Sequence, residues 1–159
     1  CRASSVKILE QHKMRKAIIF SFLILFNVAF LMASDNKKSN DEILAHYDNV
    51  MKKCNETFQV SQAYLESFRD SGSFPDETIE MPKCYINCLL TSMEVLSEDT
   101  FKPAETAAIY TVINEGTDVK DVEKVATECS ERNETSKCDR GYEYLKCIKT
   151  AMMEKRLKQ

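Results

Sequence analysis

Cysteine and histidine are the residue types of this chain whose possible chemistry depends most on how many there are and how they are spaced. Six of the seven cysteines come after residue 50, with 29, 3, 40, 8 and 8 residues between them: Cys54, Cys84, Cys88, Cys129, Cys138 and Cys147. Such cysteines either form disulfides or ligate zinc as thiolates, and the gap between Cys84 and Cys88 fits the spacing of zinc motifs. The redox compartment decides between these two uses of the sulfur.

An apolar segment near the start of the chain indicates that compartment. Basic residues at 15 and 16 follow Met14, residues 17–32 are almost continuously apolar, and small residues follow at Ala33 and Ser34. This order is typical of a secretory signal peptide, which we place at residues 14–33 with cleavage after Ala33. A membrane anchor is the competing interpretation, but the run is short for a span of about 20 residues. Secretion favours disulfides over zinc, and we expect no metal and no cofactor.

The remaining sequence predicts one small acidic domain. We expect residues 1–13 to be a non-native upstream segment and Cys1 to have no structural partner. Residues 34–159 form a domain of 126 residues with 17 basic and 24 acidic side chains, a net charge of −7, and no membrane span. This charge argues against nucleic acid and anionic membranes as partners, because both require clustered Lys and Arg.

Helical periodicity predicts an all-α fold of six helices. Ser39 and Glu42 form a capping box before the first helix, and Ser61 can cap the second. The third should run from about Ile79 to Leu96. The fourth begins at Pro103 and ends near residue 116, the fifth is capped by residue 117 or 118, and the sixth covers residues 138–152. Alternation typical of strands is missing, and Pro82 suits the first turn of the third helix.

Catalytic residues are scarce in this domain. His46 is its one histidine, at the edge of the apolar face of the first helix, and no Gly-rich phosphate loop occurs. A nucleophile–base pair therefore has no second histidine to draw on. We expect no enzyme activity, and a small secreted hydrolase is a weak alternative. Cys84 and Cys88 lie one helical turn apart, where a bridge between them would be strained, so they should pair elsewhere.

The order of the five cysteine gaps resembles that of the six-cysteine insect odorant-binding proteins, the pheromone and general odorant carriers. The resemblance covers residues 54–147. It implies a compact six-helix domain stapled by three disulfides around an apolar cavity, with the pairing Cys54–Cys88, Cys84–Cys138 and Cys129–Cys147. It also turns a set of apolar residues on inward stripes, which would otherwise be ordinary core, into a predicted ligand-binding lining: Tyr47, Met51, Phe68, Leu89, Leu90, Met93, Ile109, Ile113, Ala126, Tyr142, Leu145 and Ile148.

This resemblance implies a secreted, extracellular carrier that reversibly binds and solubilises small hydrophobic ligands, odorants or pheromones. A chemosensory receptor is then a candidate partner. Two alternatives remain open. A helical protein with a solid core could recognise a protein partner through its acidic surface, or the carrier could serve another body fluid outside olfaction.

Two sequons predict possible N-glycosylation in a secreted chain. Asn133 begins Asn-Glu-Thr in a charged loop between two cysteines, and Asn55 begins a second Asn-Glu-Thr beside Cys54. We expect Asn133 to be the better acceptor, because Asn55 should be crowded by a neighbouring disulfide.

Overall fold

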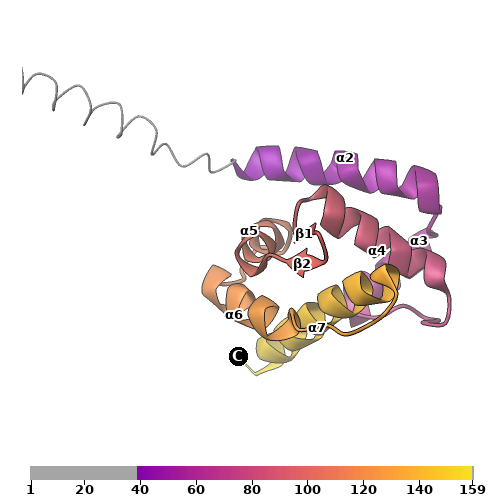
Figure 1. Ribbon diagram of the computed structural model, residues 1–159. Coiled ribbons are helices and arrows are strands. Elements are labelled where there is room, and N and C mark those ends of the chain that lie inside the picture. The colour runs from indigo at the N-terminus through magenta and orange to yellow at the C-terminus, as the bar shows by residue number, and fades with distance from the viewer. Residues whose placement is uncertain (1–38, 159) are drawn as a thin grey trace, which may run out of the picture. The chain divides into compact units, whose positions relative to one another are not determined.

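The computed structural model describes residues 39–158 (Figure 1). The expectations for residues 1–13 and for a signal peptide at 14–33 fall outside this part of the chain. The described part has six helices and one two-stranded hairpin, which confirms the predicted all-α class. Their bounds are α2 Asn40–Phe58, α3 Gln62–Ser71, α4 Glu80–Ser92, β1 Leu96–Ser97, β2 Thr100–Phe101, α5 Pro103–Ile113, α6 Val119–Cys129 and α7 Lys137–Leu157.

The helix starts follow the capping residues of the sequence. The backbone N–H of Glu42 donates to Ser39 Oγ at 3.3 Å and the backbone N–H of Ser39 donates to Glu42 Oε2 at 2.9 Å, a complete capping box. Pro103 is the first residue of α5, and Asp118 Oδ1 accepts from the N–H groups two and three residues on. Ser61 stands at the N-cap of α3, but the predicted cap is wrong in detail because its side chain makes no capping bond.

The end of α4 differs from the prediction. The helix stops at Ser92 instead of continuing to Leu96, and Glu94 adopts a left-handed conformation with φ of 60°. The N–H of Val95 then donates to the carbonyl of Leu90 at 2.9 Å. This is the hydrogen bond of a Schellman motif, which satisfies a carbonyl at the helix end. Because glutamate occupies the position where glycine is usual, no local residue signals the end of the helix here.

A short antiparallel hairpin follows, and the sequence did not predict it. Leu96 pairs with Phe101, and the two turn residues Glu98 and Asp99 have φ of 48° and 65°. Two successive left-handed residues are typical of the type I′ hairpin turn, which usually contains Asn or Gly. Arg140 Nη2 lies 3.1 Å from Asp99 Oδ1 and attaches the turn to α7. Figure 1 shows the hairpin between α4 and α5.

Three disulfides connect the helices. They join α2 to α4 through Cys54–Cys88, α4 to α7 through Cys84–Cys138, and α6 to α7 through Cys129–Cys147. This is the pairing that the resemblance implies. It leaves no thiolate among these six cysteines for zinc, even though Glu80 lies beside Cys84 and Cys138.

Aromatic side chains of α7 fill the centre of the domain. Tyr142 and Tyr144 are fully buried, and Tyr142 stacks on Phe74 with ring centroids 4.9 Å apart. Its hydroxyl accepts a hydrogen bond of 3.1 Å from the backbone N–H of Phe74. Tyr144 stacks on Phe101 of the hairpin and shares a 2.7 Å hydrogen bond with the Thr106 hydroxyl of α5. Burial raises the pKa of Tyr144 to about 12, so its hydroxyl stays neutral.

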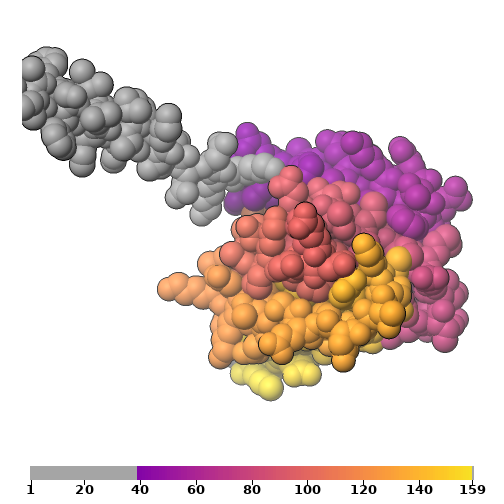
Figure 2. Space-filling view, viewed as in Figure 1, coloured from indigo at the N-terminus to yellow at the C-terminus, as the bar shows by residue number. Residues whose placement is uncertain are grey.

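These contacts bring segments distant in sequence onto one surface. In the face shown in Figure 2, α2 lies along one edge, α6 and α7 lie along the opposite edge, and the end of α4 with the hairpin lies between them. Within residues 39–158, no helix combines the length and the apolar composition needed to cross a bilayer.

Gly141 sets the distance between α4 and α7, and its substitution tests this packing. A Cβ at this position would lie 3.1 Å from the Cα of Asn87. The Cys84–Cys138 bond, three residues earlier on both helices, resists separation. Alanine favours a helix over glycine by up to about 1 kcal/mol. We nevertheless expect Gly141→Ala to lower the free energy of unfolding by about 1–3 kcal/mol through overpacking, as measured by urea denaturation. A raised unfolding midpoint would contradict this close approach.

The disulfide pairing makes a chemical prediction. Proteolysis of the unreduced protein should yield three crosslinked peptide pairs, corresponding to Cys54–Cys88, Cys84–Cys138 and Cys129–Cys147. Mass spectrometry before and after reduction identifies them. A peptide containing both Cys84 and Cys88 as an internal bridge would refute the arrangement of α4 between α2 and α7.

Candidate functional site

An apolar cavity of about 410 Å³ lies among five of the six described helices. Its volume falls within the range of roughly 300–1,000 Å³ that is usual for small-molecule sites. Helices α2, α3, α4, α5 and α7 contribute to its wall, whereas α6 contributes no residue. The lining consists of Tyr47, Met51, Gln62, Leu65, Glu66, Phe68, Arg69, Tyr85, Ile86, Leu89, Leu90, Met93, Val95, Thr106, Ile109, Tyr110, Ile113, Asn114, Leu145 and Lys149.

The helical repeat explains which side chains reach the cavity. Tyr47 and Met51 are four residues apart on α2 and therefore share one face. On α4, Tyr85 and Leu89 are also four apart, and each directly follows a disulfide-bonded cysteine. Leu145 is the apolar contribution of α7. Each helix thus presents one short stripe to a common interior, and disulfides connect three of these helices, α2, α4 and α7.

Nine of the twelve predicted lining residues border this cavity: Tyr47, Met51, Phe68, Leu89, Leu90, Met93, Ile109, Ile113 and Leu145. Their contact with a ligand remains a prediction. The other three do not reach the cavity. Ala126, Tyr142 and Ile148 are fully buried in the solid part of the core.

The reason differs among these three residues. Tyr142 shares a helical face with Leu145, but it packs against Phe68, with the two ring centroids 5.8 Å apart, and of these two aromatic residues Phe68 alone borders the cavity. Phe68 thereby forms part of the cavity wall, and Tyr142 packs against Phe68 in the core. Ala126 belongs to α6, which packs against α5 and α7 outside the cavity. Ile148 of α7 has no exposed surface and lies in the part of the core that side chains fill.

Three tyrosine hydroxyls supply polar groups to the apolar wall. The hydroxyls of Tyr47, Tyr85 and Tyr110 form no hydrogen bond with another residue of the 39–158 segment. Burial is the main cause that raises the pKa of all three, and it brings that of Tyr85 to about 12. The hydroxyls therefore remain neutral at physiological pH and can donate a hydrogen bond to a ligand oxygen. The prediction from apolar stripes found Tyr47 and missed the other two.

Polar side chains form one edge of the cavity. Glu66 and Arg69 of α3 are exposed, so the cavity reaches solvent beside this helix. Arg69 Nε donates to Asp70 Oδ1 at 2.9 Å. Lys149 of α7 is only partly exposed, and burial is the main cause that lowers its pKa. The sequence prediction missed Lys149, because a search for apolar periodicity passes over a lysine.

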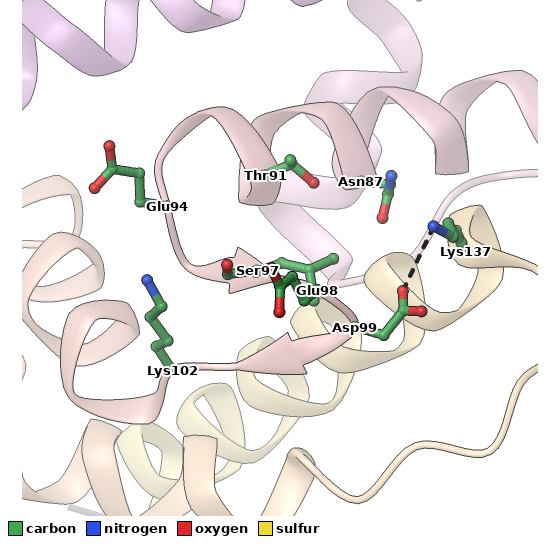
Figure 3. A pocket seen from close by; sticks show the side chains of 9 residues that line it. Asn87, Thr91, Glu94, Ser97, Glu98, Asp99, Lys102 and Lys137 are labelled. Carbon is green, nitrogen blue, oxygen red and sulfur yellow. Dashed lines mark ion pairs between the residues drawn. The ribbon is translucent and has the colours of Figure 1, made fainter.

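A second pocket of about 460 Å³ lies beside the hairpin and has a different chemical character (Figure 3). Glu94, Glu98, Asp99, Lys102 and Lys137 are among its lining residues, and Lys137 Nζ lies 3.8 Å from Asp99 Oδ1. A neutral hydrophobic molecule would desolvate these charges without compensating them. The apolar cavity is therefore the candidate site for hydrophobic cargo.

Residues 36–151 match the family model described as the PBP/GOBP family. The chain belongs to this family. Odorant-binding family proteins are secreted, disulfide-bonded carriers and not enzymes.

Individual relatives agree with this assignment. General odorant-binding protein 84a of Drosophila melanogaster is 26% identical over 105 residues, which cover 65% of this chain and 57% of that protein. The match thus spans little more than half the length of this relative. Odorant-binding protein OBP28a of Drosophila melanogaster has a TM-score of 0.59 at 17% identity, covering 75% of this chain and 99% of its own. The fatty acid binding protein OBP56a of the blowfly Phormia regina has a TM-score of 0.53 at 17% identity, covering 74% and 97%.

Outside the cavity, this PBP/GOBP-family chain exposes both sequon asparagines. Asn133 lies in the loop between α6 and α7, as expected. Asn55 is exposed on α2, so the expected crowding by the Cys54 disulfide is not present. Modification at either site remains a prediction. His46 is also exposed on α2 and does not border the cavity.

Filling the cavity tests its role. Leu145→Trp and, separately, Leu89→Trp should reduce the affinity for an apolar fluorescent probe by at least about tenfold, because each indole occupies ligand volume. Equilibrium titration measures the affinity, and far-UV circular dichroism should show nearly unchanged helix content.

Leu157→Trp provides the matched control, since Leu157 is 87% exposed at the end of α7 and lies outside the cavity. Its affinity should equal that of the unmodified protein. If both cavity variants also retain that affinity, the probe binds elsewhere.

Proposed function

We propose that this protein is a secreted, extracellular carrier that reversibly binds and solubilises small hydrophobic molecules, with odorants or pheromones as its cargo. The observation that carries the proposal is the 410 Å³ cavity, whose wall is mainly aliphatic, aromatic and methionine side chains. Membership in the PBP/GOBP family supports the same role. A chemosensory receptor is the partner to which such a carrier would deliver its cargo.

Binding in this proposal is driven by transfer of apolar ligand surface out of water. Each Å² of apolar surface removed from water contributes roughly 25 cal/mol. Met51 and Met93 line the cavity, and their flexible thioether side chains can adapt to ligands of different shape. The neutral hydroxyls of Tyr47 and Tyr110 can donate to an alcohol, aldehyde or carbonyl oxygen. No covalent step is involved, so the ligand leaves in the form in which it entered.

The names of the relatives support hydrophobic cargo to different extents. The Drosophila relatives are named for odorant binding, and the blowfly protein is named for fatty acid binding. Both solved structures are 17% identical to this chain, so their likeness indicates a shared fold. We therefore propose odorants and pheromones as cargo from the family and the cavity together.

A displacement experiment tests the carrier function. An apolar naphthylamine probe should gain fluorescence on entering the cavity of the oxidised protein, and long-chain alcohols should displace it with saturation at one equivalent. Glycerol, which has hydroxyls but little apolar surface, should not. If neither the probe nor any apolar alcohol binds, the carrier function is refuted and recognition of a protein partner through the acidic surface becomes the better explanation.

A further inference from the structure

Lys149 is the least exposed of the charged residues that line the apolar cavity. It follows Leu145 by one turn on α7, and both residues border the cavity. Its stem packs against the end of α3, where a Cβ on Gly72 would lie 3.7 Å from Lys149 Cγ. Gly72 is buried, and with φ of +78° it forms the left-handed C-cap of α3. The stem of Lys149 therefore contacts the C-terminal end of α3. This packing holds the aliphatic part of the lysine side chain in place.

Other lysines of α7 have close carboxylate partners, whereas Lys149 does not. Lys146 Nζ lies 2.6 Å from Glu77 Oε2, and Lys155 Nζ lies 2.9 Å from Asp121 Oδ1. Within residues 39–158, no ion pair includes Lys149. Asp70 is close enough to raise its pKa, but the carboxylate of Asp70 already accepts a hydrogen bond from Arg69.

The surroundings of Lys149 contain more positive than negative charge. Besides burial, Arg156 and Arg69 lower its pKa, and Asp70 alone opposes them. Glu66, the one carboxylate in the lining, is exposed and accepts a 3.2 Å hydrogen bond from Gln62 Nε2. A partly buried cation beside an apolar wall is costly unless an anion pairs with it. This edge of the cavity therefore lacks one negative charge.

We propose that the cavity selects long-chain carboxylates, with the hydrocarbon chain along Leu89 and Leu145 and the carboxylate paired with Lys149 Nζ. This inference rests on the proposed carrier function, since it names the ligand class of the same cavity. A charge-assisted hydrogen bond between ammonium and carboxylate is about twice as strong as a neutral one. An alcohol of equal chain length buries the same apolar surface but leaves the lysine charge without a partner.

The first measurement compares three ligands of equal chain length with the oxidised protein at neutral pH. Dodecanoate should bind about tenfold more tightly than dodecanol, the ratio expected for one hydrogen bond to a charged group. Methyl dodecanoate, which retains the chain and the carbonyl but no charge, should resemble dodecanol. Displacement of the naphthylamine probe gives all three affinities under the same conditions.

Variants assign the preference to one side chain. Lys149→Met keeps most of the stem and should weaken dodecanoate binding about tenfold, leaving dodecanol binding within about twofold. Lys149→Arg should retain the preference for dodecanoate. Lys158→Met is the matched control, because it removes one positive charge from an exposed position at the C-terminal end of α7, outside the cavity. It should bind all ligands as the unmodified protein does.

The outcomes separate this proposal from the carrier function. Equal affinity of the unmodified protein for dodecanoate and dodecanol would overturn carboxylate selection and leave the carrier function intact. An equal loss for both ligands in Lys149→Met would also overturn it, and would show that the lysine acts through packing of its stem. Binding of none of the three ligands would instead refute the carrier function. If Lys149→Met loses helix content, Lys149→Gln is measured in its place. The affinities of the unmodified protein for dodecanoate and dodecanol still decide whether the cavity selects carboxylates.

Discussion

The two disulfides of α4 are the constraint on which the cavity depends. Cys84 and Cys88 are one turn apart, yet the first bonds to α7 and the second to α2. Helix α4 is therefore fixed between two neighbours that cannot move inward independently. An empty volume in a protein core normally costs about 24 cal/mol per Å³, which favours collapse. A crosslink contributes typically about 2–4 kcal/mol by restricting the unfolded chain, so crosslinks can offset part of the cost of an interior that remains open.

Local sequence signals were sufficient to predict the start of a helix where one side chain determines it. Ser39, Pro103 and Asp118 start helices because their hydroxyl, fixed φ or carboxylate satisfies an identifiable requirement of a helix terminus. The end of α4 could not be predicted in this way. Glu94, like the two turn residues of the hairpin, adopts positive φ without being glycine. Tertiary packing of Leu96 and Phe101 holds this segment, and such contacts are not visible in local sequence.

The candidate site shows a comparable limit. Periodicity identifies the side of a helix that faces inward, but not which part of the interior is filled. Leu145 and Tyr142 share a face of α7, yet Leu145 borders the cavity whereas Tyr142 packs against Phe68 and Phe74 in the filled core. Pairing of the cysteines was likewise beyond geometry alone, since excluding Cys84–Cys88 left several arrangements open. The family resemblance supplied the pairing that the structure contains.

Lys149 illustrates how stability and recognition can oppose each other at one residue. Without a ligand, burial disfavours its charged form, which is why its pKa is lowered. Because protonation in the folded state is disfavoured, the lysine reduces stability at pH values below its folded pKa, and this cost disappears as the pH rises above its unfolded pKa. A bound carboxylate would reverse the direction by favouring the protonated amine. The chain as a whole is acidic and repels anions, whereas Arg69 and Lys149 at the polar edge of the cavity attract a carboxylate. A side chain that weakens the empty protein can in this way contribute directly to the choice of cargo.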